Sequence, residues 1–343
     1  MPPPLDGTLE SWPDLAVDYA GAALLCGNGV SVNVWPAFAY GSLFEHARDG
    51  GLTAEDLELF AETENFERVL SDLNTAIRVN ATLAQPTDAI YQRYRSIQRG
   101  LGHAVREVHL TRTQVPDSVL TRIRDEIVDY EWIFSTSYDL LLYWSMGYGG
   151  SFSPFIDHFR QAGLRFDPDR ADVYAGQVPV YFLHGALHLV VGGSGVTWKL
   201  RRNAIQSVLD QFGEPIDGDP QARPLLVSEG TARDKLRAIE GNAYLASALQ
   251  TLRELELPVV VFGSSLGPQD DHLLDALNEH PKRPIAISVL PGNRRHVAAR
   301  QADIYARLET DELRFSMRPA TRWAIQRSKS RGDCVQRAVT RRA

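Results

Sequence analysis

Short apolar runs separated by helical patterns constrain the fold of this chain more than any other feature of its sequence. Four runs have the length of buried strands and a fifth is a candidate: "AALLC" (22–26), "WIFST" (132–136), "PVYFL" (179–183), "PVVVF" (258–262) and "IAISVL" (285–290). Continuous rather than alternating apolarity is typical of strands that are covered on both faces. Strands that alternate with helices predict an α/β fold with a Rossmann-like, doubly wound parallel sheet.

The spacing of these runs predicts how the chain is organised. The first two predicted strands are too far apart for one crossover helix, so we expect a large helical insertion over 42–130. Residues 192–224 are rich in glycine, proline and charge, which predicts a loop-rich connection near the ligand-binding edge. We expect one domain over 15–310 and a basic C-terminal extension over 311–343.

Charge argues against a general attraction to nucleic acid, because the formal net charge is −7. The extension differs: from Arg318 to Arg342 it carries eight basic residues and one acid, Asp333. A nucleic acid or an acidic partner would have to bind there. A solvated amphipathic helix or a frayed end is the favoured interpretation of this segment.

The two cysteines, Cys26 and Cys334, are too few for a four-thiolate zinc site, and no C-x-x-C pair exists. They are expected to be free thiols in a reducing compartment. No apolar run approaches the roughly 20 residues that span a bilayer, and the first residues, "MPPPLDGTLE", lack the pattern of a signal peptide. We therefore expect a cytoplasmic protein without a membrane partner.

Small, polar or titratable residues follow four of the predicted strands. They are Gly27-Asn28-Gly29-Val30-Ser31, Ser137-Tyr138-Asp139, His184-Gly185 and Gly263-Ser264-Ser265-Leu266. In open α/β sheets, ligands bind at the carboxyl ends of the strands. Glycines there let the backbone approach a phosphate, which the following N–H groups can bind. Because the third glycine of the dinucleotide fingerprint is missing, a tight strand-to-loop turn is an equally good interpretation of the first motif.

Two further motifs have competing interpretations. His184 ends an apolar strand, where a lone histidine is more often structural than catalytic; His188 lies four residues on, but no third ligand is spaced to complete a metal site. "GSSLG" (263–267) matches the G-x-S-x-G nucleophile elbow, with Ser265 as the nucleophile. Only 76 residues follow Gly267, which leaves little room for the rest of a hydrolase sheet.

Four motifs, taken in order, resemble those of the SIR2-like (sirtuin-like) superfamily. That order is a G-A-G-x-S or G-N-G-x-S loop, a T-x-N-x-D segment, a strand ending in His-Gly, and G-[TS]-S-L. This chain has "GNGVS" (27–31), "STSYD" (135–139), "LHGALH" (183–188) and "FGSSLGPQDDHLLDAL" (262–277). The segments "YDLLLYW" (138–144) and "LHGALHL" (183–189) resemble the bacterial group called DUF4917.

The resemblance implies NAD chemistry, with NAD as substrate and no metal. Deacetylases of the superfamily carry a four-cysteine zinc module that this chain lacks, so it is more similar to the zinc-less bacterial members that hydrolyse NAD in anti-phage defence. By resemblance, the loop of Gly27, Asn28, Gly29, Val30 and Ser31 cradles the diphosphate, and Gly263, Ser264 and Ser265 bind near phosphate or ribose. His184 is the general base, Asp139 lies near the nicotinamide, and Ser137 orients water or ribose.

One departure from the superfamily bears on activity. Family members have asparagine where this chain has Ser137, and a serine side chain is shorter and lacks the amide's paired donor and acceptor. The resemblance therefore implies an NAD+ hydrolase whose turnover is weakened or lost. A non-catalytic subunit that binds NAD or ADP-ribose and an NAD-dependent protein deacylase are the alternatives. Because uncontrolled hydrolysis of NAD is toxic to a cell, the activity is expected to be regulated. The protein is expected to act as a homo-oligomer or in a complex with a sensor protein.

Overall fold

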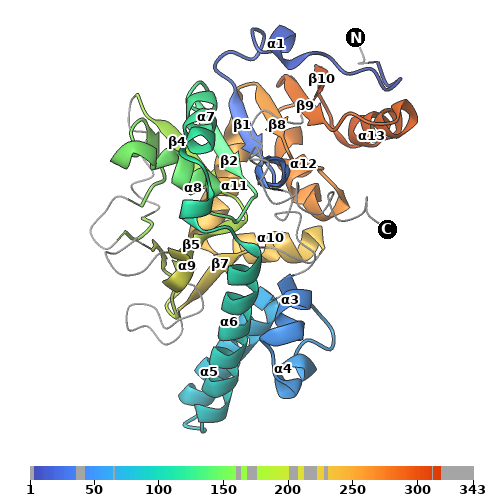
Figure 1. The fold of residues 1–343 in the computed structure, drawn as a ribbon. Coiled ribbons are helices and arrows are strands. Elements are labelled where there is room, and N and C mark those ends of the chain that lie inside the picture. The colour runs from blue at the N-terminus through green and yellow to red at the C-terminus, as the bar shows by residue number, and fades with distance from the viewer. Residues whose placement is uncertain are drawn as a thin grey trace, which may run out of the picture.

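The structure is a computed structural model that describes residues 4–35, 43–64, 66–159, 164–167, 176–200, 208–211, 222–227, 231–310 and 312–317 (Figure 1). Its main element is a seven-stranded sheet in which every pair of neighbouring strands is parallel. The strands are β1 (Ala23–Cys26), β2 (Trp132–Ser135), β3 (Phe155–Ile156), β4 (Val178–Phe182), β8 (Val259–Phe262), β9 (Ile285–Val289) and β10 (Leu313–Met317). All five predicted strands are present.

The strand order confirms the predicted Rossmann-like fold. The sheet runs β10-β9-β8-β1-β2-β4-β3. Without the short edge strand β3, the remaining six follow the order 3-2-1-4-5-6 of a doubly wound sheet. The order reverses between β1 and β8, so this is the topological switch point where ligands of such folds bind. The residues that follow β1 and β8 are therefore the first place to look for a site.

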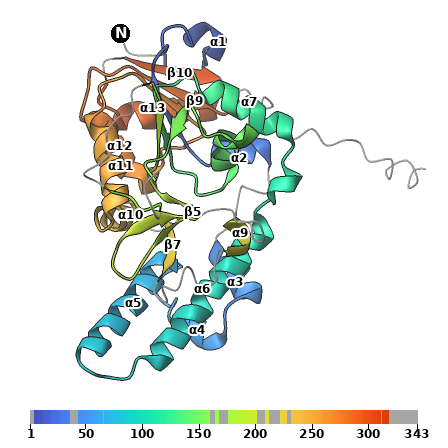
Figure 2. The same cartoon turned by 90° about the vertical axis from the view of Figure 1, so that its left-hand side faces the viewer.

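Helices cover both faces of the sheet. Figure 2 shows α11 and α12 on one side of the strands and α7 on the other. All four residues of β1 are buried, as continuous apolarity predicts for a central strand. The helices of this part are α1 (Trp12–Leu15), α2 (Gly29–Val34), α7 (Asp117–Ile127), α8 (Leu141–Met146), α10 (Ala232–Glu240), α11 (Ala243–Glu254), α12 (Asp271–Asn278) and α13 (Arg294–Arg307).

The described helices between residues 43 and 127 belong to two cores. The helices α3 (Leu43–Gly50), α4 (Ala54–Glu58), α5 (Phe66–Thr82) and α6 (Asp88–Val108) pack around a second hydrophobic cluster that includes Phe60, Phe66 and Tyr94. They project together from one end of the molecule in both views. Helix α7 instead buries Leu120 and Ile123 in the core of the main sheet. Within this range, the helices that pack around the second cluster therefore end with α6, and the cluster continues into the segment after residue 184 through Leu187 and Leu226.

A second, antiparallel sheet lies between the main sheet and these projecting helices (Figures 1 and 2). Its strands are β5 (Gly185–Val191), β6 (Thr197–Lys199) and β7 (Arg223–Leu226), in the order β6-β5-β7. The expectation of a loop over 192–224 is therefore wrong in part, since β6 and the start of β7 are strands and α9 (Val208–Gln211) is a helix. Strand β5 begins at Gly185, the glycine of the His-Gly motif, which the sequence placed at the end of a strand.

The expected boundary of the basic extension is also corrected. The extension was expected to begin at residue 311, but β10 pairs with β9 over its whole length as the edge strand of the main sheet. Glu10 accepts hydrogen bonds from Arg314, so the chain before residue 15 also packs against this edge. The basic residues from Arg318 onward lie outside the described residues. Within the described ranges, no helix combines the length and the apolar character needed to cross a bilayer.

Candidate functional site

The glycines that follow β1 and β8 let two loops touch at the switch point. The N–H of Gly27 donates to the carbonyl of Phe262 and the N–H of Gly29 to that of Gly263, both at 2.8 Å. A β-carbon on Gly27 would lie 2.5 Å from the Gly263 oxygen, and one on Gly263, whose φ is +72°, would lie 2.5 Å from the nitrogen of Val30. These two glycine N–H groups are therefore engaged by the neighbouring loop, and close backbone approach explains the residue type.

Asp139 gathers the polar groups that follow β1 and β2. Its Oδ2 accepts hydrogen bonds from the hydroxyl of Ser31, at 2.5 Å, and from that of Ser137. Its Oδ1 accepts from the backbone N–H of Leu141 at 2.8 Å, and the Ser137 hydroxyl also lies 3.4 Å from Oδ1 of Asn28. We call Asn28, Ser31, Ser137 and Asp139 the Asp139 cluster. The structure thus brings together four residues that the sequence predicted for one site.

Three residues of the Asp139 cluster, Ser31, Ser137 and Asp139, are buried, so the charge of Asp139 is screened less than it would be in water. Asp139 is 2% exposed and Ser31 is 3% exposed. Burial, and secondly the negative charge of Asp139, raises the pKa of the nearby Cys26 thiol to about 12. Cys26 therefore stays protonated and unreactive at neutral pH. Asn28 is half-buried, so it lies at the boundary between this cluster and solvent.

His109 adjoins the cluster and was not found from the sequence. Its Nε2 accepts the N–H of Leu140 at 3.0 Å, so its proton lies on Nδ1, which donates to the carbonyl of Leu110 at 2.6 Å. Burial lowers its pKa, and the charge of Asp139 opposes that effect. His109 follows directly after α6, far from any predicted strand end, and no local motif marks it. It holds the backbone next to Asp139 in place.

His184 lies where the chain leaves the main sheet. On either side of it, the N–H of Leu183 donates to the carbonyl of Ser135, and the N–H of Leu187 to that of Tyr138, each at 2.8 Å. The segment that carries His184 therefore runs beside the segment that carries Ser137. Gly185 has φ +71°, and a β-carbon there would lie 1.9 Å from the carbonyl oxygen of Leu225. The glycine of the His-Gly motif is thus required by the turn into β5.

The side chain of His184 contacts His272 rather than the serines. The two Nε2 atoms lie 2.8 Å apart, and both rings are buried. Burial, followed by the positive charge of Lys235 and the His272 ring, lowers the pKa of His184 well below 6.5. Burial likewise lowers the pKa of His272 to about 4. Both rings are therefore neutral at pH 7, the state in which an imidazole can act as a base.

The loop after β8 presents the remaining predicted residues. The hydroxyl of Ser264 accepts the N–H of Leu266 at 3.2 Å, while Ser265 is exposed. In this loop the residue other than glycine with positive φ is Leu266, at +44°, and Ser265 has ordinary backbone. His272, the nearest histidine along the chain, is engaged by His184. The described geometry therefore gives no support to a nucleophile elbow at Ser265.

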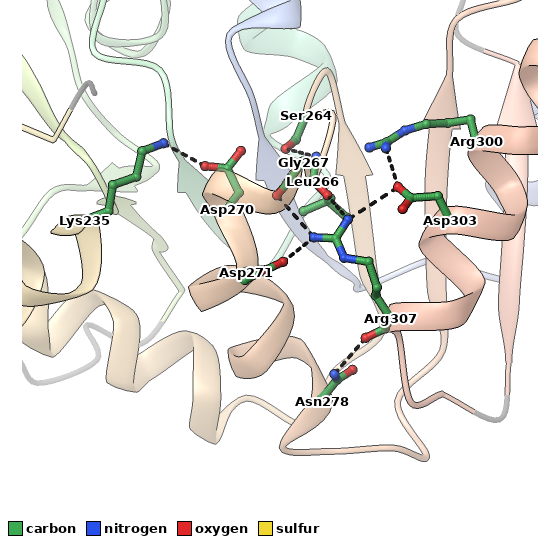
Figure 3. Close-up of polar contacts among 10 residues, drawn as sticks. All are labelled: Lys235, Ser264, Leu266, Gly267, Asp270, Asp271, Asn278, Arg300, Asp303 and Arg307. Atoms are coloured by element: carbon green, nitrogen blue, oxygen red, sulfur yellow. Dashed lines mark hydrogen bonds and ion pairs between the residues drawn. The ribbon is translucent and has the colours of Figure 1, made fainter. Parts of the chain in front are cut away.

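Arg307 holds this loop in place from α13. Figure 3 shows its guanidinium between the loop and the start of α12. It donates to the carbonyls of Leu266, at 2.8 Å, and Gly267, at 3.2 Å, and it pairs with Asp271 and Asp303. No motif in the sequence predicts this contact, because α13 lies beyond the last motif.

Metal binding finds no support in the described geometry. No three histidine, cysteine, aspartate or glutamate side chains are grouped to hold an ion within the described ranges. His188, considered beside His184 as a local pair, is fully buried and stacks on Tyr143, with ring centroids 4.2 Å apart. Neither of its ring nitrogens has a hydrogen-bond partner among the residues that the structure describes.

Comparison with known protein families shows which family the chain belongs to. The family model described as "Domain of unknown function (DUF4917)" matches residues 24–315. The chain belongs to the DUF4917 family. The matched range runs from β1 into β10, so it spans the whole main sheet together with the projecting helices. A search of curated proteins returns no match to the chain.

In this DUF4917 protein, two adjoining groups of polar residues meet the carboxyl edge of the sheet. The Asp139 cluster supplies a buried carboxylate and two hydroxyls, and the second group supplies a neutral histidine pair. The loop around Ser264 and Ser265 adds hydroxyls that are half-buried or exposed. A carboxylate can stabilise developing positive charge, and a neutral imidazole can accept a proton.

Proposed function

We propose that this protein binds NAD+ and cleaves the bond between nicotinamide and ribose, as an NAD+ glycohydrolase of the SIR2-like type. The observation that carries the proposal is the Asp139 cluster. Residues from the ends of β1 and β2, more than a hundred positions apart in sequence, converge on one buried carboxylate beside the switch point. Dinucleotides bind at this position in doubly wound sheets.

The chemistry of the bond calls for the groups that are present. Nicotinamide leaves through a transition state in which positive charge develops on the ribose, so a fixed negative charge nearby lowers the barrier. Asp139 supplies that charge and is held by three donors, from Ser31, Ser137 and Leu141. A water molecule must then attack the ribose and lose a proton. Neutral His184 is the proposed acceptor of that proton.

The diphosphate would be bound mainly by hydroxyls and backbone N–H groups. Gly263 and Ser264 are half-buried and Ser265 is exposed, so all three can meet a ligand at the rim. The cations nearby, Lys235 and Arg307, already pair with carboxylates. Because the N–H groups of Gly27, Gly29 and Val30 already bond backbone carbonyls, the cradle proposed for residues 27–31 must rely mainly on Asn28.

A second function, NAD or ADP-ribose binding without turnover, is favoured by one observation. The Ser137 hydroxyl donates to Asp139. A serine has one proton to donate, so in this arrangement Ser137 does not donate to a ribose or to a water molecule. An asparagine at the same position could bond Asp139 through its amide N–H and still offer its carbonyl oxygen to the ligand. The protein would then be a regulatory subunit that senses the nucleotide.

The proposed biological setting is bacterial anti-phage defence by NAD depletion, a form of abortive infection. Uncontrolled cleavage would harm the cell, so activity is proposed to depend on assembly, as a homo-oligomer or with a sensor protein. The helices α3 to α6 project from the main sheet and are a suitable surface for such assembly. An NAD-dependent deacylase remains a lesser candidate that no contact in the described region favours.

The test measures NAD+ binding by calorimetry and nicotinamide release by chromatography, for the wild type and His184→Ala. We expect binding by both proteins. Any release by the wild type should fall about 10²- to 10⁴-fold in the variant, the usual worth of a general base. Circular dichroism must show that the variant is folded. Binding without release, even with proteins encoded next to it, would favour the regulatory subunit, and absence of binding would contradict both functions.

A further inference from the structure

The start of α12 is held by contacts to three other elements. This segment reads Asp270-Asp271-His272, and each side chain contacts a different partner. Asp270 pairs with Lys235 of α10 at 2.9 Å, and both side chains are largely buried. Asp271 pairs with Arg307 of α13. Figure 3 shows both ion pairs side by side at the beginning of the helix. The third residue, His272, contacts His184, which lies between β4 and β5.

The contact between the two histidines has a chemical consequence. Because the facing atoms are both Nε2, a single proton lies between the rings, and one nitrogen donates while the other accepts. The protonation of the outer nitrogen of His184 then follows from which ring holds this proton. His272 is 1% exposed, and its Nδ1 has no hydrogen-bond partner among the described residues. Among the described residues, His184 is therefore the one hydrogen-bonding partner of the His272 ring.

We propose that His272 is a positioning residue for His184, which fixes the orientation and the tautomer of the His184 ring. The ion pairs Lys235–Asp270 and Arg307–Asp271 hold the start of α12 so that this contact persists. The proposal rests on the proposed function for the catalytic role of His184. An imidazole that must accept a proton works only in the correct tautomer, and enzymes fix that tautomer through a partner on the other ring nitrogen.

Burial keeps the histidine pair neutral near pH 7, and the charged groups around it shift its pKa further in both directions. The positive charge of Lys235 acts on both rings, and Arg253 of α11 acts on His272. Asp270 and Asp271 oppose them at His272. Burial has the largest effect on each ring and disfavours the charged form. A neutral pair with a single shared proton is the arrangement that this environment stabilises.

The test compares His272→Phe, His272→Gln and a matched control, His188→Phe. Phenylalanine keeps the ring volume but cannot hydrogen-bond, whereas the glutamine amide can still bond Nε2 of His184. His188 is equally buried, packs between Tyr143 and Phe182, and makes no hydrogen bond among the described residues. Its replacement by phenylalanine should therefore change little. All four proteins are labelled with ¹⁵N-histidine, and the ring nitrogens of His184 are observed by NMR.

We expect one tautomer of His184 in the wild type and in His188→Phe. In His272→Phe the two ring nitrogens should give averaged shifts typical of a tautomer mixture, with partial recovery in His272→Gln. The kcat for nicotinamide release should fall about 10- to 100-fold in His272→Phe with little change in KM, because the buried His272 would act on the reaction through His184. The glutamine variant should regain part of the loss.

Two outcomes separate this proposal from the proposed function. If His272→Phe behaves like His188→Phe in the NMR spectra, or lowers kcat no more than that control, the positioning role is wrong. If the protein neither binds nor cleaves NAD+, the proposed function is wrong, and the NMR comparison alone decides whether His272 fixes the His184 ring. A folded state in every variant is checked by the dispersion of the same spectra.

Discussion

Gly27 and Gly263 touch across the switch point of the sheet, where a β-carbon on Gly27 would lie 2.5 Å from the carbonyl oxygen of Gly263. The loops that follow β1 and β8 are therefore packed backbone to backbone. This contact brings the segment that carries Asn28 and Ser31 next to the segment that carries Ser264. A substitution at either glycine should therefore displace the backbone of both loops.

Gly27→Ala should destabilise the protein by about 2 to 3 kcal/mol, because a methyl group has no room against the opposing backbone. The φ of Gly27 is not in the left-handed region, so the loss of stability would come from the steric clash and not from backbone strain. Gly292→Ala is the matched control, since a β-carbon there meets nothing within 4 Å. It should change the free energy of unfolding by less than about 0.5 kcal/mol. Urea unfolding of both variants checks the prediction, which fails if their losses are equal.

Asp139→Asn should cost about 2 to 3 kcal/mol of folding free energy. The carboxylate accepts from two hydroxyls and one backbone N–H, and bonds to a charged acceptor are stronger than neutral ones. The amide would place an N–H where one of these donors now points. Asp129→Asn, at an exposed position, is the control and should be nearly neutral. Similar unfolding midpoints for the two variants would refute the structural role given to Asp139.

Stability should fall as the pH is lowered from about 6.5 toward 4. Burial lowers the pKa of His158 and His272 to about 4 and that of His184 and His188 well below 6.5. In this window the unfolded chain binds protons that the folded protein does not, so acid favours unfolding. Each histidine contributes up to about 1.4 kcal/mol per pH unit.

Urea unfolding at a series of pH values measures this slope, and His188→Phe is the comparison. Because the variant lacks one of the buried histidines, its stability should decline less steeply, by at most one histidine's share. A free energy of unfolding that stays constant between pH 6.5 and 4.5 in the wild type would contradict the buried, neutral state of these rings.

Local sequence patterns predicted the central strands of the main sheet, but they did not predict the edge strand β10. The run "PVVVF" is apolar on both faces, and that local pattern is sufficient to predict a central strand such as β8. β10 was missed because "LRFSM" (313–317) alternates apolar and polar residues and lies beside the basic extension. Its place in the sheet depends on pairing with β9 and on the contact of Glu10 with Arg314, which no local pattern contains.

The candidate site was also predicted only in part, because some of its contacts follow from the fold class and others depend on how the helices pack. Strand ends meet at one edge of a parallel sheet, so the convergence of Ser31, Ser137 and Asp139 follows from the fold class. The partner of His184 does not, because His272 lies 88 residues further along the chain on a helix. Which helix residue meets which strand end depends on helix placement, and ion pairs such as Lys235–Asp270 help to fix that placement. His109 was missed because it follows a helix and acts on backbone.

The central claim, NAD+ cleavage at this strand edge, is tested most directly at Ser137. The Ser137→Asn variant can bond Asp139 and still orient water or ribose, so it should release nicotinamide faster than the wild type at saturating NAD+. We expect a gain of about a hundredfold, the worth of one transition-state hydrogen bond. Adding His184→Ala to this variant should remove the gain. If the wild type is already fast and asparagine adds nothing, Ser137 does not orient the water molecule; if neither protein releases nicotinamide or binds NAD+, the account of this site is wrong.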